Sequence, residues 1–347
     1  MTLQPTATRD TVVRSRTRLA RRSRTVNAVL ALLIAAVLAA SLMVGQTFYS
    51  PADVVRVVLG HDVPGATFTV GRLRLPRAVL ATVVGLCFGL GGVTFQTMLR
   101  NPLASPDIVG ISAGASAAAA FAIIVLSLGA TAVSVFAIVA GLGVALLIYV
   151  LSYKDGVAGT RLILIGIGIA AMLDSVTAYV LSQAGRWDLQ EAMRWLTGSL
   201  NGTEWGQVVP VLIALGILTP VLLSQSRNLS MTQLGDDTAA ALGVRVDRTR
   251  LIVVVAAVGL IAFATAAAGP VAFVAFLSGP IAARIVGPGA SVLVPSALVG
   301  ALLVLVADLC GQFAFGTRYP VGVVTGVVGA PYLVYLLIRT HRAGGSL

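Results

Sequence analysis

Two acidic residues are the side chains of this sequence most able to do chemistry, because both stand inside long apolar runs. A carboxylate in such a run, as at Asp174 and Asp308, is costly enough to be a functional candidate by default. Acids at membrane depth could carry protons in an ion-coupled transporter. No chain of ionisable neighbours accompanies either one, however, and Asp308 lies near the end of its run, where water or Arg318 could satisfy it. Proton coupling is therefore the less favoured hypothesis.

Other chemistries are limited by the scarcity of several residue types. Lys154 is the only lysine, so no phosphate-binding loop of the form G-x-x-x-x-G-K-[ST] exists, and any ATP must be hydrolysed by a partner. His61 and His341 lie in polar links, which excludes a histidine metal site within a membrane run. Cys87 and Cys310 have the apolar neighbours of free thiols. No nucleophile with a base and no carboxylate pair occurs. We expect no cofactor and no enzymatic activity.

The elements that must position these residues are membrane-spanning helices. Of the 347 residues, 57% are hydrophobic and 11% are charged, whereas soluble domains carry about 25% charged residues. A helix needs about 20 apolar residues to cross a bilayer. Spans are predicted at 26–46, 77–98, 108–127, 131–151, 161–182, 206–224, 250–269, 271–286, 292–312 and 321–339. The predicted fold class is an all-α integral membrane protein of about ten transmembrane helices, forming one polytopic domain over residues 26–340.

The distribution of positive charge sets the expected orientation. Residues 1–25 hold seven arginines and no apolar run, so we expect a disordered cytoplasmic tail. A secretory signal peptide is the alternative, but the apolar run that follows is longer than a signal peptide needs. With a cytoplasmic N-terminus, ten spans leave both termini in the cytoplasm, and 17 of the 24 Lys and Arg residues fall on that side. The basic excess then reflects topology in the cytoplasmic (inner) membrane and its lipid, and not nucleic acid.

The polar link 225–250 contains a pattern that predicts a short surface helix. Residues 234–244 read Leu-Gly-Asp-Asp-Thr-Ala-Ala-Ala-Leu-Gly-Val, with acids that suit a helix N-terminus and a glycine that suits the position after its end. The small apolar face of this helix has no partner within the link, which favours docking into another protein. A solvated helix packed on the bundle is the alternative. The candidate docking residues are Leu234, Gly235, Asp236, Asp237, Ala240, Leu242 and Gly243.

Two apolar segments, 101–116 and 269–280, are interrupted by proline and glycine. Such breaks are tolerated at membrane depth where the backbone lines protein or water and not lipid. Paired breaks in corresponding halves of a transporter point to its translocation path. If spans two to five repeat as spans seven to ten, the two sets start on opposite sides and the repeat is inverted. The candidate path residues are Asn101, Pro102, Ser112, Gly114, Ser116, Gly269, Pro270, Ser278, Gly279 and Pro280.

Four motifs resemble the FecCD family, the iron-siderophore and cobalamin permeases of ABC importers. They are Arg74-Leu-Pro-Arg77, the 101–116 stretch, the 235–244 loop and the Tyr-Pro-Val-Gly-Val-Val-Thr-Gly-Val-Val-Gly-Ala-Pro run over 319–331, and the likeness covers about residues 70 to 340. The resemblance implies a type II ABC importer permease with ten spans per subunit. It also implies a second permease subunit, identical or paralogous, two cytoplasmic ATPase subunits, and an extracytoplasmic binding protein, either a lipoprotein or periplasmic.

The resemblance further implies roles for particular residues. The 235–244 helix would be the coupling helix seated in the ATPase, spans two, three, five, eight and ten would line the path, and Arg74 and Arg77 would pair with acids of the binding protein. Gln312 stands where many members carry a further arginine for that docking, a role that only Arg318 could replace here. Many members also carry Pro-His where this chain has Gly279-Pro280, which favours a ferric siderophore over cobalamin as substrate. Haem is a further alternative, and an ion-coupled secondary transporter is the rival from another class.

Overall fold

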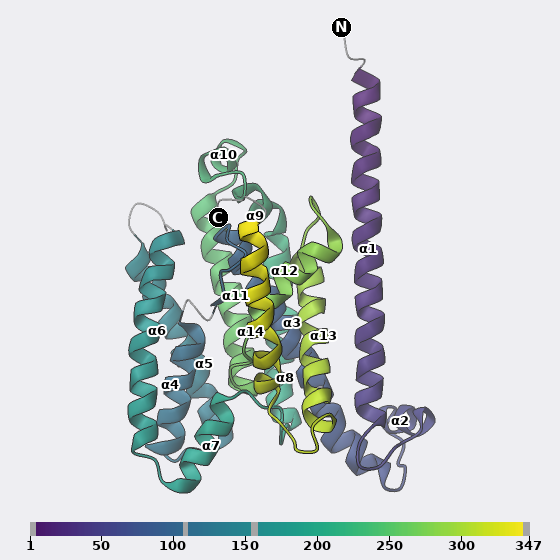
Figure 1. The fold of residues 1–347 in the computed structure, drawn as a ribbon, viewed down its shortest axis with the longest axis vertical. Coiled ribbons are helices and arrows are strands. Elements are labelled where there is room, and N and C mark those ends of the chain that lie inside the picture. Colours follow the sequence, from purple (N-terminus) through teal and green to yellow (C-terminus); the bar gives the residue numbers. More distant parts are fainter. Residues whose placement is uncertain (1–4, 107–109, 154–158, 343–347) are drawn as a thin grey trace.

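The computed structural model describes residues 5–106, 110–153 and 159–342. Within these ranges the chain is helical and contains no β-strand, as the apolar patterning predicts. Figure 1 shows the long helices running side by side in one bundle, with short helices at both of its ends.

Ten apolar helices correspond to the ten predicted spans. Seven of them are long and apolar enough to cross a membrane: α1 (Pro5–Met43), η1 (Thr67–Arg74) continuing into α3 (Leu75–Met98), α5 (Ala130–Ser152), α6 (Gly159–Ser182), α8 (Trp205–Ser224), α11 (Val246–Ala268) and α13 (Leu293–Phe313). The other three are α4 (Ile111–Ile124), α12 (Val274–Val286) and α14 (Val321–Arg342). The segment η1 is a π-helix. The predicted all-helical membrane fold is therefore confirmed.

The first helix differs from the prediction at its start. Helix α1 begins at Pro5, so most of the residues expected to form a disordered tail continue the first span as helix. No proline or glycine occurs between Pro5 and Gly45, and alanine and arginine favour helix. Once the apolar span has nucleated a helix, each added residue gains a hydrogen bond at little further entropic cost. Residues 1–4 lie outside the described part of the chain.

Four short helices lie at the two ends of the bundle (Figure 1). Helices α2 (Pro51–Val58) and α7 (Arg186–Leu196) lie at one end, and α9 (Ser226–Thr232) and α10 (Asp236–Ala241) lie at the other. Helix α2 is capped by Ser50, whose hydroxyl accepts a hydrogen bond from the Asp53 N–H at 3.2 Å.

Helix α3 forms the centre of the bundle, because three of its glycines allow two neighbours, α13 and α12, to approach it closely. A Cβ atom added at Gly85 would lie 2.5 Å from the Gly300 oxygen of α13, and one at Gly89 would lie 2.3 Å from the Ser296 oxygen. A Cβ atom at Gly92 would lie 1.9 Å from the Ala275 oxygen of α12. Helices α3 and α13 therefore cross closely at Gly85 and Gly89. We call these three glycines the α3 notches.

Gly322 and Gly326 of α14 are four residues apart, as Gly85 and Gly89 are, but only one of them is closely packed. A Cβ atom at Gly322 would lie 2.1 Å from the Thr197 oxygen, whereas one at Gly326 would meet nothing within 4 Å. Only Gly322 is therefore required by a close approach.

The two interrupted segments occupy corresponding positions in the predicted repeat, where span three matches span eight. Helix α4 has 14 residues and α12 has 13, and each is shorter than the helices around it. Each follows a residue with positive φ, Gly110 at 74° and Phe273 at 62°. The paired breaks read from the sequence thus form two short helices, each preceded by a left-handed residue.

Candidate functional site

The link between α8 and α11 forms the predicted short helix, although over six residues, Asp236–Ala241. Asp236 and Asp237 occupy its first turn. At its other end Gly243, with φ 86°, donates its N–H to the Ala240 oxygen at 2.9 Å, and the Val244 N–H reaches the Ala239 oxygen at 3.0 Å. This pair of bonds is the Schellman ending for which glycine is suited.

The apolar residues of this link divide between two faces. Ala239 is buried against the rest of the link, while Ala240 is exposed. Leu234 and Leu242 are 65% and 57% exposed. We call Leu234, Ala240 and Leu242 the α10 surface. An apolar surface of this kind at the tip of a polar link is available to a partner.

The Asp236 carboxylate joins α10 to two spans. Arg100, just after α3, donates from Nη2 to Asp236 Oδ1, and Arg250 of α11 donates from Nη2 to Asp236 Oδ2 at 2.6 Å. Arg100 has a φ of 52°, which is unusual for a residue other than glycine. The sequence analysis assigned Asp236 to the helix N-terminus and to the candidate docking residues, and it did not predict these partners within the chain. The signal was available, since both arginines flank the ends of spans on the same side of the bundle.

At the opposite end of the bundle, Arg74 binds the end of α1. Its guanidinium donates to the Leu42, Met43 and Thr47 carbonyl oxygens at 2.9, 3.0 and 2.7 Å, and it stands over the Tyr49 ring at 5.2 Å from the centroid. The Leu42 and Met43 carbonyls lie in the last turn of α1, where a helix leaves carbonyls without a partner, so Arg74 helps to satisfy them. The Arg74 guanidinium was expected to pair with acids of a binding protein, and in this structure it donates hydrogen bonds to backbone carbonyls of its own chain.

Arg77 is also used inside the chain. Its guanidinium contacts both oxygens of Asp308, with Nη2 at 2.8 Å from Oδ1 and Nε at 3.0 Å from Oδ2, and its Nη1 donates to Asn201 Oδ1 at 2.6 Å. The Gln312 amide donates to Asp308 Oδ2 at 2.7 Å. The two charged side chains are only 15% and 6% exposed.

The expectation that water or Arg318 satisfies Asp308 is therefore wrong. Arg77 and Gln312 do so, and Arg318 remains exposed in the link between α13 and α14. Of the three arginines predicted for docking, Arg318 alone presents an exposed side chain in this structure, and its role stays a prediction.

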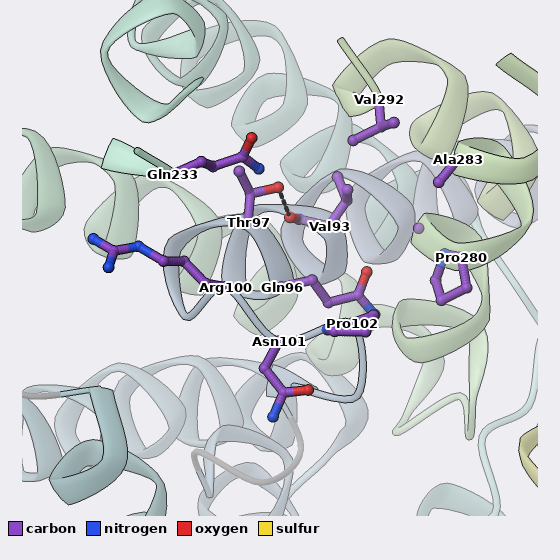
Figure 2. Close-up of a pocket in the computed structure, with 11 residues that line it drawn as sticks. Val93, Gln96, Thr97, Arg100, Asn101, Pro102, Gln233, Pro280, Ala283 and Val292 are labelled. Atoms are coloured by element: carbon purple, nitrogen blue, oxygen red, sulfur yellow. Dashed lines mark hydrogen bonds between the residues drawn. The ribbon is translucent and has the colours of Figure 1, made fainter. Parts of the chain in front are cut away.

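Two cavities are each lined by several of the predicted path residues, and the first of them lies near α10. It has a volume of about 320 Å³ and contains four of the predicted path residues: Asn101, Pro102, Gly279 and Pro280. Figure 2 shows Asn101 and Pro102 on one side and Pro280 on the other, with Gln96 between them. The Gln96 amide donates to the Phe276 oxygen at 2.9 Å, and a Cβ atom at Gly279 would lie 1.9 Å from Gln96 Oε1. We call this the Asn101 cavity.

The second cavity lies nearer α7 and has a volume of about 330 Å³. It contains three predicted path residues, Ser112 and Ser116 from α4 and Pro270 from the other break. Asp174 of α6 lines it as well, which the sequence analysis singled out as an acid within a span but did not assign to the path. We call this the Asp174 cavity.

Three predicted path residues line neither cavity. A Cβ atom at Gly114 would lie 2.7 Å from Val144 Cγ2, and one at Gly269 would lie 2.2 Å from the Trp195 oxygen. Ser278 is buried and donates to the Val274 oxygen at 2.6 Å. Gly114 and Ser278 serve close packing, whereas Gly269 both permits the close approach of Trp195 and lines a third cavity together with Glu191 and Arg194. Residues 107–109 of the first broken segment lie outside the described residues.

Comparisons with known proteins agree with this arrangement. The chain matches the FecCD transport family over residues 32–339. It is 38% identical over 302 residues to the ferric enterobactin transport system permease protein FepG of Escherichia coli (strain K12), covering 86% of this chain and 91% of that one. It is 36% identical over 274 residues to the cobalamin import system permease protein BtuC of Halobacterium salinarum, covering 78% of this chain and 74% of that one.

A solved chain from a metal-chelate type ABC transporter in an inward-facing conformation has the same fold. Its TM-score is 0.82 at 25% identity, covering 91% of this chain and 99% of that chain. The match of nearly the whole chain in sequence and in fold shows that this multi-pass membrane protein belongs to the FecCD transport family, the permease subunits of ABC importers.

Proposed function

We propose that this chain is the permease subunit through which an ABC importer moves a ferric siderophore across the cytoplasmic membrane. The single observation that best supports a driven permease is the α10 link. An exposed apolar surface, formed by Leu234, Ala240 and Leu242, adjoins a carboxylate that holds arginines from two different spans. A partner that moves this surface would therefore move those spans.

Asp236 mechanically connects the α10 surface to the Asn101 cavity. When the ATPase subunits close, α10 is displaced, and the Asp236 carboxylate draws Arg100 and Arg250 with it. Arg100 precedes Asn101, and both line the Asn101 cavity. Each guanidinium donates to a different oxygen of the Asp236 carboxylate, and hydrogen bonds between charged groups are stronger than those between neutral groups. The displacement thus reaches the first broken segment and the start of α11 together.

The partners of the proposed importer follow from the family. They are ABC ATPase subunits at α10, a second permease subunit and a substrate-binding protein. The α10 end is proposed to face the cytoplasm, because most of the Lys and Arg residues lie in the links on that side. Arg318 is then on the outer face, where exposed charges steer a docking protein more than they bind it.

The choice of ferric siderophore over cobalamin rests on the relatives and on one motif. The FepG relative is named for ferric enterobactin and the BtuC relative for cobalamin, so membership of the family leaves both open. The Gly279-Pro280 pair, where many members carry Pro-His, favours the siderophore. Cobalamin or haem is the alternative substrate.

An ion-coupled transporter is disfavoured by the state of Asp308. A proton carrier must be able to gain and lose a proton during the cycle, whereas the Asp308 carboxylate is held by Arg77 and Gln312. Asp308 is accordingly proposed to hold α3 and α13 together.

The deciding experiment measures uptake of radiolabelled iron, supplied as a ferric siderophore, in cells lacking this chain and in the same cells after its re-expression. We expect uptake to be lost and then restored, and to persist when the proton gradient is discharged at constant ATP. Iron uptake that does not depend on the chain would indicate cobalamin or haem as substrate. Uptake that follows the proton gradient would contradict the ATP-driven mechanism.

A further inference from the structure

Asp174 presents a carboxylate at a depth where the surrounding helix crosses the membrane. It lies in α6, within the candidate span Arg161–Ser182, of which only 17% is buried in the chain. The Asp174 side chain is exposed and makes no ion pair with any residue that the structure describes. A charge that faces hydrocarbon at the centre of a span is strongly unfavourable. This face of α6 therefore borders water or protein in the membrane.

The surroundings of Asp174 identify what it borders. The Asp174 cavity is lined by three residues with hydroxyl groups, Ser112 and Ser116 on α4 and Thr197 after α7. Pro270 of the second broken segment lines it as well. Segments from both halves of the chain thus meet at this carboxylate, as the walls of a translocation path must. Among the described lining residues Asp174 is the one charged side chain.

Neighbouring charges do not cancel this carboxylate. An adjoining cavity is lined by Glu191 and Arg194 of α7, one charge of each sign. The Arg77–Asp308 pair likewise sums to zero. These flanking charges are balanced in sign, and Asp174 is the one charged side chain among the described residues that line its own cavity.

We propose that Asp174 is a specificity-determining residue that selects neutral and cationic ferric siderophores over anionic ones as they pass the Asp174 cavity. The inference rests on the proposed siderophore transport. Ferric complexes of similar size differ widely in charge: a ferric trihydroxamate is neutral or, with a free amine, cationic, whereas a ferric tricatecholate carries three negative charges. A carboxylate in a cavity with low-dielectric walls attracts the first class and repels the second. The relatives do not indicate which substrate charge this chain prefers, since they are named for chemically different substrates.

The test uses the complete importer, with its ATPase and binding-protein partners, in proteoliposomes. Initial uptake of radiolabelled iron is measured for a cationic ferric trihydroxamate, a neutral ferric trihydroxamate and a trianionic ferric tricatecholate, each at a concentration that saturates the binding protein. We expect Asp174→Asn to lower the ratio of cation uptake to trianion uptake by roughly tenfold, as a full charge at close range implies. Asp174→Glu, which keeps the charge, retains the wild-type ratio.

The matched control is Asp188→Asn, which removes a half-buried carboxylate from the first turn of α7, outside the lining of the Asp174 cavity. We expect this variant to leave the ratio unchanged, and an equal shift in both variants would overturn the proposal. An unchanged ratio in Asp174→Asn, with uptake of siderophores intact, would overturn the charge selection alone. Absence of all siderophore uptake in the wild-type importer would instead contradict the proposed function.

A second measurement keeps the inference testable if Asp174→Asn fails to assemble. Asp174→Cys is made together with Cys310→Ser, because Cys87 is fully buried and Cys310 is the remaining native thiol. A water-soluble, membrane-impermeant methanethiosulfonate should label position 174 in the assembled importer. Complete protection from this reagent would show that the side chain does not face the aqueous path and would overturn the proposal.

Discussion

Replacement of Arg77 by leucine would leave a carboxylate buried without its main partner. Asp308 is 6% exposed, and in the variant it keeps only the Gln312 amide at 2.7 Å. Removal of one member of a buried ion pair typically destabilises a protein by about 3–5 kcal/mol, because the remaining charge is uncompensated. Since the Gln312 hydrogen bond persists, we expect a loss near the lower limit, about 3 kcal/mol.

The double variant Arg77→Leu, Asp308→Leu separates the charge effect from a loss of packing. Both ions are then replaced by apolar groups, which is often close to neutral. The remaining penalty is the loss of one hydrogen bond each by the Gln312 amide and the exposed Asn201 amide. We expect the double variant to be destabilised by only about 1 kcal/mol, and so to be more stable than Arg77→Leu.

The assay is thermal unfolding of the purified chain in detergent, followed by tryptophan fluorescence. Arg318→Leu is the matched control, because Arg318 is exposed at the same end of the bundle, and we expect a change within about 0.5 kcal/mol. If the double variant loses as much stability as the two single variants together, the pair carries no coupling energy and this reasoning is refuted.

Three further perturbations concern the α10 link and the packing of α12. Leu242→Asp places a charge on the α10 surface, and we expect loss of co-purifying ATPase with normal membrane insertion; retained ATPase would contradict the coupling role. Asp236→Asn weakens both bridges, and we expect several-fold less substrate moved per ATP hydrolysed, while the exposed Asp247→Asn keeps the wild-type ratio. Gly279→Ala forces a methyl group against the Gln96 oxygen, and we expect a loss of about 2 kcal/mol on thermal unfolding, whereas Gly326→Ala, with open space around it, should not destabilise.

The membrane spans could be predicted from the sequence because hydropathy is a local property. Apart from the start of α1, and from η1, which extends the second span back to Thr67, each apolar helix begins and ends within four residues of its predicted span. The early start of α1 has a physical cause. Composition indicated that the arginine-rich tail could not bury a core, which is correct, but a helix continuing from a span needs no core of its own.

The partners of the charged residues could not be predicted, because they depend on contacts between distant segments. Arg77 and Asp308 are 231 residues apart, and nothing local distinguishes Arg77, which faces inward, from Arg318, which does not. Proline and glycine correctly marked the two broken segments. Some of their residues line a cavity, such as Pro270, and others serve packing, such as Gly114. This difference is decided by neighbours that no sequence window contains.

The α3 notches have a consequence for how the protein is made. Most residues of α3 are buried. However, α13, which packs against two of the α3 notches, begins about 200 residues later in the chain. At a translation rate of about 5–20 residues per second, α3 waits roughly 10–40 s in the membrane for that partner. During this interval its glycine face is open to any other helix with small residues. Fragments that end before α13 are therefore expected to be recognised by membrane proteases as unassembled chains, and the speed of synthesis itself limits how often wrong helix pairs form.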